Sequence, residues 1–576
     1  MGGQDGSQRT PGPSRRRRRR RLTFTAVLAL AIVASAAFVV KGIGARQEPA
    51  TPVSAAHATT AGGGSVSALA SPVSAETRTS GPAGVQSSAL IAENAQPGSP
   101  DWQISATPAG GGSIAGWADH TDAQVGDSVR LFVSATAPSF TASAYRMGYY
   151  GGAGARRVWS SAPTAGVVQP PCPVTPGVNM VSCAGWSPSL TMPVTSSFVQ
   201  GDYLIKLVGA DGAQSYVILT VWDPSRSATY LFETHSLTEQ GWNTYGGFDF
   251  YAGHGPCAPG VPSYPQCNRA RVVSFDRPYV DGFGSADFLY NEYPLLRFME
   301  QHGLDVSYVS DIALDHDPAF MLQHKAFLSL GHDETWTYAE RQGIETAAAH
   351  GVNVAFMSAA AMVRHARLQP SSIGPDRQEV NYRSSAEDPL GATGDPHLVT
   401  GNTWDSPPTS WPTLPLIGEA YSGYLFPQST PADFVVNDAS AWIYQGTGLH
   451  NGSVLPSLIG SDFDHLAPRG TPPNLQVLGH SPIPLSKGFT GGATWSGVTY
   501  SDMTYYTRPD SNAGIFDAGM VSWIDGLTPC PAATAGCASP QVQQMTGNLL
   551  RLFGEGPAGR NVPSVSNQAT LVPPRS

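Results

Sequence analysis

The sequence predicts a multi-domain protein in which an all-β, immunoglobulin-like sandwich precedes an α/β domain. Two observations predict this order. Residues 101–223 contain short stretches of alternating polar and apolar residues, separated by glycines and Asp-Gly turns, as in the half-buried strands of a sandwich. After Thr229, short apolar strands alternate with amphipathic helices, which is typical of βαβ units around a parallel sheet.

The individual elements follow from hydrophobic periodicity and from the glycines that end helices. We predict the sandwich over 99–225, the α/β domain over 226–556 and a disordered tail over 557–576. The clearest expected strands are 128–134, 203–208, 215–221, 272–275, 306–309, 326–330 and 352–357, and the expected helices are 286–301, 338–350 and 541–553. Residues 370–480 are rich in Pro and Gly and are expected to be irregular, whereas 505–523 returns to strand-like text.

The first 98 residues have the composition of an export signal followed by a tether. A basic segment, 1–21, ends in seven arginines and is expected to stay in the cytoplasm, while 22–40 is apolar enough to span a bilayer as a signal anchor or signal peptide. Residues 42–98 are rich in Ala, Ser, Thr, Gly and Pro and predict a disordered stalk. We therefore expect a membrane-anchored protein with extracellular domains, or a secreted one. Both Sec and twin-arginine export stay open.

Charge and cysteine content agree with an exported protein. The net charge is −10, and because residues 1–41 carry +8, the rest of the chain carries −18, which argues against a nucleic-acid or anionic-lipid partner. The six cysteines form three pairs close in sequence, which predicts three disulfides; metal binding is the alternative, but no CxxC pattern supports it. The pairs are Cys172 with Cys183, Cys257 with Cys267, and Cys530 with Cys537.

The strongest candidate site follows the apolar strand 326–330. His332, Asp333 and Glu334 come directly after it and before a helix. Ligands of open α/β sheets bind at the carboxyl ends of the strands, where His332 can act as a base and Glu334 as a base or metal ligand. The alternative is that Asp333 or Glu334 only caps the next helix. We assign all three residues as catalytic candidates.

Three further segments carry polar or aromatic residues that suit a site. Residues 241–251 combine glycines, aromatics and Asn243, which fits either a pocket-lining loop or aromatic packing around a turn. Asp276 and Arg277 follow a strand and are expected to form a structural pair. Residues 460–465 include Asp462, Asp464 and His465, a spacing that occurs in cation sites and in many other places.

These segments, in this order, resemble the large (beta) subunit of N,N-dimethylformamidase and its family, over about 116–553. The likeness rests on the text of residues 145–152, 242–251, 274–279, 331–336, 446–448 and 516–523. The resemblance implies a sandwich followed by a three-layer α/β domain like that of class I glutamine amidotransferases. It also implies an enzyme that hydrolyses an amide C–N bond and works with a small partner subunit; a homo-oligomer is the alternative assembly.

The resemblance further implies a single iron held by two tyrosines and one glutamate. By motif the glutamate is Glu334, with His332 beside it, and our choices for the tyrosines are Tyr251 and Tyr279. Iron(III) bound by such oxygen ligands would be a Lewis acid for an amide carbonyl or for water. We assign Trp242, Asn243 and Asp462 to substrate binding.

Three departures from the family text change this expectation. Trp242 stands where the family has tyrosine, Ala359-Ala360 replaces Gly-Asn, and Gly460-Ser461-Asp462 replaces Gly-Tyr-Glu. Dimethylformamide itself is therefore not the expected substrate. The sequence leaves two hypotheses: an exported metal-dependent amide hydrolase with an altered site, and an extracellular binding or scaffold protein whose site has decayed.

Overall fold

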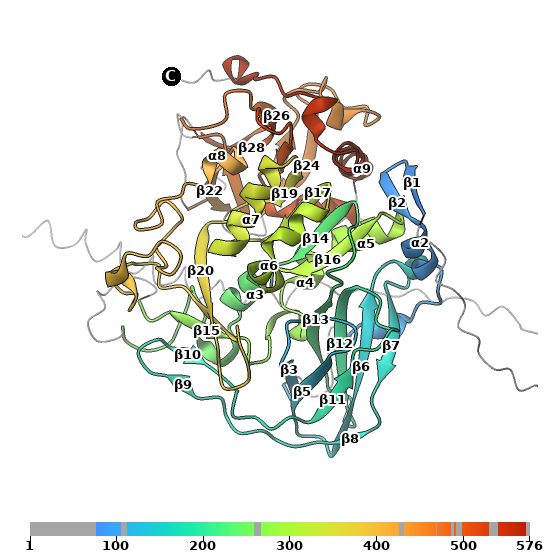
Figure 1. Ribbon diagram of the computed structural model, residues 1–576, viewed down its shortest axis with the longest axis vertical. Helices are drawn as coiled ribbons and strands as arrows, with labels where there is room; N and C mark the ends of the chain where they lie inside the picture. The colour runs from blue at the N-terminus through green and yellow to red at the C-terminus, as the bar shows by residue number, and fades with distance from the viewer. Residues whose placement is uncertain are drawn as a thin grey trace, which may run out of the picture. The chain divides into compact units, whose positions relative to one another are not determined.

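The computed structural model describes residues 77–104, 112–257, 267–425, 431–467, 469–484, 489–490, 498–528 and 539–571 (Figure 1). The predicted basic segment and membrane span lie outside these residues, as do residues 42–76 of the predicted stalk. In the described ranges, no helix combines the length and the apolar character needed to cross a membrane. The described residues belong to one compact unit.

Two sheets form the N-terminal part. One contains β11 (Leu190–Pro193), β5 (Ser128–Ala135) and β3 (Ile114–Ala118); the other contains β4 (Asp122–Ala123), β13 (Gln214–Val221), β12 (Gly201–Gly209), β6 (Ser139–Met147) and β7 (Ala155–Ser160), with β8 (Thr164–Ala165) paired to β6. Apolar side chains from both sheets, such as Leu131 and Ile205, share one core. The predicted strands 128–134, 203–208 and 215–221 are confirmed as β5, β12 and β13.

The α/β part is built on a seven-stranded sheet. Its order is β16 (Val306–Ser310), β14 (Tyr230–Thr234), β17 (Ala326–Gly331), β19 (Asn353–Ser358), β29 (Gly514–Asp517), β28 (Val498–Thr507) and β26 (Gln476–Pro484). The first five strands are parallel, and the last two pair antiparallel. The parallel pairing predicted for the strands at 306–309, 326–330 and 352–357 is therefore confirmed.

Helices cover both faces of this sheet. Successive residues of each strand point to opposite sides, so each strand contributes apolar side chains to both of the cores that these helices form. Leu328 packs in the core that includes α5 (Tyr293–Gln301) and α9 (Pro540–Gly554). Its neighbour Phe327 packs in the core of α6 (Asp311–His316) and α7 (Tyr338–Ala349). The buried strands therefore read as continuous apolar runs, and the predicted helices 338–350 and 541–553 are confirmed as α7 and α9.

Smaller sheets contain strands from the segment expected to be irregular and from other parts of the chain. One orders β15 (Val272–Ser274), β21 (Gln378–Val380), β20 (Arg364–Gln369) and β18 (Thr335–Thr337); a second orders β25 (Asp462–His465), β22 (Ala420–Leu425) and β27 (Phe489–Thr490); and two hairpins pair β23 (Ala432–Val435) with β24 (Val454–Ile459) and β9 (Val174–Thr175) with β10 (Met180–Val181). The helices α3 (Ser236–Trp242) and α8 (Leu414–Ile417) are short. The strand predicted at 272–275 therefore exists, but outside the parallel sheet.

Three expectations differ from the structure. The helix expected over 286–301 is divided into α4 (Phe288–Asn291) and α5, because Glu292 leaves the helical region with φ −130°. Residues 77–98, assigned by composition to the stalk, form β1 (Arg78–Gly81), β2 (Gly84–Ser87) and α2 (Ser88–Asn94). Residues 557–571 of the expected tail carry two short 3-10 helices and bury Ala558 and Leu571.

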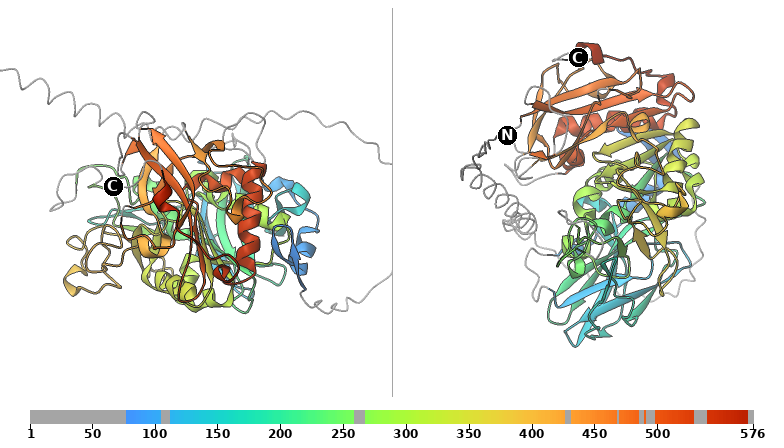
Figure 2. Two further views of the ribbon diagram at one scale, coloured as in Figure 1. Left: turned by 90° about the horizontal axis from the view of Figure 1, so that it is seen from above. Right: turned by 90° about the vertical axis from the view of Figure 1, so that its left-hand side faces the viewer.

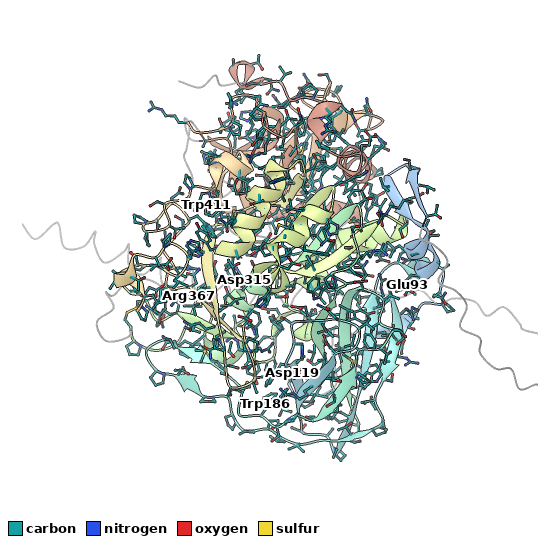
Figure 3. All side chains as sticks on the ribbon, in the orientation of Figure 1. Glu93, Asp119, Trp186, Asp315, Arg367 and Trp411 are labelled. Carbon is teal, nitrogen blue, oxygen red and sulfur yellow. A yellow bond between two sulfur atoms is a disulfide. The ribbon has the colours of Figure 1, made fainter. Side chains whose placement is uncertain are left out.

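The β1–β2 hairpin is ordered because it packs on the α/β part. Figure 2 shows this blue segment beside the red helix α9, with which β2 is in contact. The backbone N–H of Val85 donates to the Tyr230 hydroxyl over 3.0 Å. On α2, Glu93 (labelled in Figure 3) accepts hydrogen bonds of 2.7 Å from the Tyr150 hydroxyl and from Arg156 Nε. A polar composition alone does not reveal such contacts.

Two of the three predicted disulfides are confirmed. Cys172 pairs with Cys183, and Cys257 pairs with Cys267. The third predicted pair, Cys530 with Cys537, lies outside the described residues. Close spacing in the sequence was therefore a sound guide to both of the described pairs.

Candidate functional site

The candidate site begins at a sharp turn where β17 ends. Gly331 adopts φ 49°, a left-handed conformation that suits glycine, and a Cβ there would lie 2.4 Å from the Asn291 carbonyl oxygen. The turn separates β17 from β18, which pairs with β20 instead of the central sheet. The cap of α7 is Thr337, in a capping box with Glu340, so the alternative that Asp333 or Glu334 caps this helix is wrong.

Glu334 lies at the centre of the site and is only 5% exposed. Its Oε1 accepts a hydrogen bond of 3.2 Å from Arg364 Nε, and its Oε2 accepts one of 3.2 Å from Trp242 Nε1 and another from the Tyr251 hydroxyl. Burial alone would raise the pKa of Glu334, but Arg364, His332 and Arg383 outweigh it and hold the pKa below its ordinary value. Glu334 is therefore a charged carboxylate at neutral pH.

A stack of flat side chains supports this carboxylate. The Trp242 indole is 3.7 Å from the Tyr251 ring and nearly parallel to it, at 12°. The Arg383 guanidinium carbon lies 3.9 Å from the centre of the same ring. Two groups this close to one ring centre must occupy opposite faces, so Tyr251 is held between them. Trp242 therefore fits both interpretations of residues 241–251: it packs on an aromatic ring, and it lines the site.

His332 faces the same region as Glu334. Its Nε2 lies 3.7 Å from Glu334 Oε2, and its ring is tilted against Trp242 at 5.3 Å. Asp462 approaches from β25, where its carboxylate accepts hydrogen bonds of 2.8 Å from the Tyr421 hydroxyl and the Ser461 hydroxyl. Burial raises the pKa of Asp462, and the charge of nearby His332 opposes that shift. The structure therefore brings His332, Glu334 and Asp462 together.

Asp333 points the opposite way, into the protein interior. Its Oδ2 accepts a hydrogen bond of 2.6 Å from the Ser329 hydroxyl, and burial raises its pKa to about 6. Asp464, two residues beyond Asp462 on β25, is also buried: it is 3% exposed and its two oxygens accept the Ala360 N–H over 3.0 and 3.2 Å. Burial raises the pKa of Asp464 to about 7. Neither carboxyl shares the exposed side of the site.

Tyr279, expected as a metal ligand, and Asn243, expected as a substrate-binding residue, have other surroundings than those roles require. Tyr279 lines a neighbouring cavity with Glu239, and burial and that carboxyl raise its pKa. The Asn243 side chain donates over 2.9 Å to Gln240 Oε1 and to the Pro278 carbonyl, and accepts from the backbone of Tyr245. These bonds within the chain occupy the groups of Asn243 that would otherwise bind a substrate.

The expected pair of Asp276 with Arg277 is not formed. Asp276 accepts a hydrogen bond of 2.8 Å from Arg377 Nε instead. Arg277 donates to Gln240 Oε1 over 2.8 Å and to the carbonyl of Phe248. Consecutive residues after a strand point to different sides, so neighbours in the sequence had little chance of pairing.

Sequence reasoning did not find Arg364 and Arg383, the two cations of the site. Arg364 begins β20, and its Nη1 also donates to the Asn402 carbonyl over 2.6 Å. Arg383 lies beyond β21 with φ 54°. An arginine is common on a polar surface, so no local signal distinguishes these two. Only the strand pairing of β18 with β20 shows that Arg364 lies near the Glu334 loop.

Backbone strain marks several loops that form or border this site. Among non-glycine residues, Ala360, Met362, Arg383 and Ser461 have positive φ angles between 52° and 56°. Such conformations cost about 1–3 kcal/mol each and gather at functional sites. Ala360 and Met362 follow β19, in the segment where the sequence departs from the family text. A strained turn after a strand can present a nucleophile, but Ala360 has none to present.

Among the described residues, no three His, Cys, Asp or Glu side chains are arranged to hold a metal ion.

Comparison with known proteins identifies a family for this chain. No curated protein matches the chain. The family model described as "N,N-dimethylformamidase beta subunit-like, C-terminal" matches residues 141–538, which is more than half of the chain and includes the candidate site. The chain therefore belongs to the N,N-dimethylformamidase beta subunit-like family.

Proposed function

We propose that this protein is a hydrolase of non-peptide amide C–N bonds and that the reaction takes place beside His332 and Glu334. One observation carries the proposal: His332 and Glu334, in the loop after β17, lie close to Asp462, the first residue of β25, at the carboxyl end of a parallel sheet. Ligands of open α/β sheets bind at this edge. Membership of a family named after an amide-cleaving enzyme supports the same class of reaction.

The residues suit an attack by water. Acting as a general base, the imidazole of His332 would take a proton from a water molecule as the water oxygen bonds to the carbonyl carbon, and the same proton would pass to the nitrogen as the C–N bond breaks. The products are a carboxylic acid and an amine, which exchange a proton to become a carboxylate and an ammonium ion at neutral pH. The positive charges of Arg364 and Arg383 would stabilise the negative charge that develops on the carbonyl oxygen. Trp242 and Tyr251 act as positioning residues, because they hold Glu334.

Iron stays a prediction drawn from the resemblance, and the groups around Glu334 do not fit it. Trp242 stands at a family tyrosine, and its indole N–H only donates. The Glu334 oxygens already accept bonds from Arg364, Trp242 and Tyr251, and a guanidinium supplies the positive charge that a metal would bring. Burial and the Glu334 carboxylate raise the pKa of Tyr251, which disfavours the phenolate that iron requires. We therefore route no step through a metal.

A second candidate function is binding without catalysis. It is favoured by one observation: both Glu334 oxygens already accept hydrogen bonds from Arg364, Trp242 and Tyr251 within the chain, while Trp242 stays 37% exposed. In that case the sandwich and the exposed indole would engage a glycan or protein. For either function we propose the topologies that the resemblance implies: immunoglobulin-like for the sandwich and glutamine amidotransferase-like for the α/β part.

Export, a membrane anchor or secretion, and a small partner subunit or homo-oligomer all remain part of the proposal. The two described disulfides support an oxidising location. An extracellular hydrolase would meet small amides directly from the surroundings.

Turnover of simple amides by the purified full-length protein tests the proposal. N-methylformamide, N-methylacetamide and N-methylpropanamide would be offered and the released methylamine measured by fluorescent derivatisation. We expect turnover, with His332→Ala and Glu334→Gln each lowering kcat/KM by about 10²- to 10⁴-fold. His397→Ala and Glu345→Gln, at an exposed loop and on the outer part of α7, are matched controls expected to have no effect.

Two results would count against the proposal. Folded protein that releases no amine from any of the three amides would favour the binding function. Activity lost on dialysis against a chelator and restored by iron would show that a metal takes part despite the donor set. Unchanged activity after the chelator supports the mechanism given above.

A further inference from the structure

A small cavity adjoins the Glu334 site and shares Trp242 with it. Its volume is about 10 Å³, and its lining is acidic and aromatic: Glu239, Trp242, Asn243, Tyr279, Asp281, Ala286 and Asp287. A volume of this size is at the lower limit for one water-sized group. The cavity is therefore suited to the head of a small ligand and not to a whole substrate.

The lining carries three carboxyl groups and no basic side chain. Glu239 is only 3% exposed, and its Oε1 has no hydrogen-bond partner within the described part of the chain. A buried acceptor left without a partner is unfavourable, so a ligand that donates to it would bind favourably. Burial raises the pKa of Glu239 and of Asp287, and repulsion from Asp287 adds to the shift at Glu239.

The aromatic wall adds a second preference. The Trp242 indole stacks on Tyr251 but remains 37% exposed, and indole faces attract organic cations. A bound cation would lower the raised pKa values of these carboxyl groups and favour their ionised form. Three such carboxyl groups beside an indole therefore favour an ammonium group over an anionic one.

We propose that this cavity binds the ammonium group of a small alkylamine. This inference deepens the proposed function and rests on it in one respect, namely that the amine is the product of C–N cleavage. Trp242 connects the two sites, because its Nε1 donates to Glu334 over 3.2 Å while its ring lines the cavity. The amide nitrogen of a substrate held near His332 would then face Glu239 and Asp287.

The substrate class follows from the size and charge of the cavity. The amine half must be small, as in an N-methyl or unsubstituted amide, because the cavity holds about one water-sized group. Amines of this size carry a positive charge at neutral pH, since their protonation resembles that of a lysine side chain. The carboxylates would therefore retain the amine after the bond has broken.

Direct binding of methylammonium tests the inference without any turnover. Methylammonium chloride would be titrated into the full-length protein by calorimetry, with methanol as a neutral ligand of similar size and potassium chloride as a simple cation. We expect saturable binding of methylammonium only. Asp287→Asn and, separately, Asp281→Asn should weaken it about tenfold or more, while Asp510→Asn, an exposed aspartate beyond the opposite end of β29, should leave it unchanged.

Several outcomes would overturn the inference. They are equal binding of methanol or potassium, or methylammonium affinity that is unchanged in both Asp287→Asn and Asp281→Asn when circular dichroism shows both variants folded. Methylammonium binding in a protein that cleaves no amide would support the cavity while refuting the hydrolase proposal, so the two failures are distinguishable. In an active protein, methylammonium should also inhibit competitively with an inhibition constant equal to its dissociation constant.

Discussion

Breaking the buried ion pair between Arg146 and Glu300 from one side is expected to destabilise the link between the sandwich and the α/β part strongly. Arg146 on β6 and Glu300 on α5 are both fully buried, and their guanidinium and carboxylate groups form two bonds, of 2.8 and 3.1 Å. Arg146 also donates to Gln200 and Tyr150, and Glu300 accepts from Tyr308 over 2.6 Å. Every strong donor of the pair is therefore engaged.

Arg146→Met keeps an unbranched apolar stem in place of the arginine side chain and removes its charge. The Glu300 carboxylate would then stay buried with only neutral donors, and breaking one side of a buried pair costs about 3–5 kcal/mol. Glu300→Met should cost a similar amount, because it leaves a buried guanidinium. The double variant leaves no buried charge, so we expect it to cost much less than the sum of the single variants, with a coupling of roughly 3 kcal/mol.

The four proteins would be compared by urea unfolding, followed by tryptophan fluorescence. The matched control is Arg157→Met on β7, whose pair with Asp101 is about half exposed and should contribute less than about 1 kcal/mol. Single variants that each lose less than 1 kcal/mol, or a double variant whose loss equals the sum, would refute the reasoning. The family motif at residues 145–152 would then need an explanation other than this structural one.

Two further predictions concern stability. The folded-state pKa of Asp464 is about 7, above the ordinary value of 3.8, so the folded protein binds more protons between these pH values and stability falls as pH rises through them, by roughly 4 kcal/mol for about three pKa units. Asp464→Asn should flatten this fall between pH 5 and pH 8 in urea unfolding, and a slope equal to that of the parent protein would contradict the assignment. Replacing Cys172 and Cys183 together by alanine opens a short loop and should lower the free energy of unfolding by about 3 kcal/mol; unchanged unfolding under the same conditions would show that the pair contributes nothing.

Hydrophobic periodicity predicted most of the strands and helices, because buried elements carry apolar residues in continuous runs or at regular spacing. The apolar run 326–330 became β17, and the run 352–357 became β19. β14 was not predicted, although it lies in the middle of the parallel sheet. Its sequence, Tyr230–Thr234, is short and ends in Glu233 and Thr234, which are polar yet fully buried. A polar residue whose partners come from distant segments gives no local signal of burial.

Only those residues of the candidate site that directly follow a predicted strand in the sequence could be predicted. His332 and Glu334 follow β17 directly, so the position of the strand placed them. Arg364 reaches Glu334 through the pairing of β18 with β20, and Arg383, on a strained backbone, lies over Tyr251 beside it; neither feature has a local sequence pattern. The sequence therefore predicted the residues next to Glu334 along the chain, but not the two arginines that lie near it in space.

The charge balance around Glu334 shows why one substitution matters more than the others. A tyrosine at position 242 could offer an oxygen to a metal; the indole of Trp242 can only donate, and it donates to Glu334 itself. The carboxylate is thereby held as an acceptor for Trp242, Tyr251 and Arg364, and the compensating positive charge is supplied by arginine. Trp242 also forms the aromatic wall of the acidic cavity next to the site. A single change from an oxygen ligand to an indole therefore disfavours the metal and, at the same position, creates a surface that suits an ammonium group.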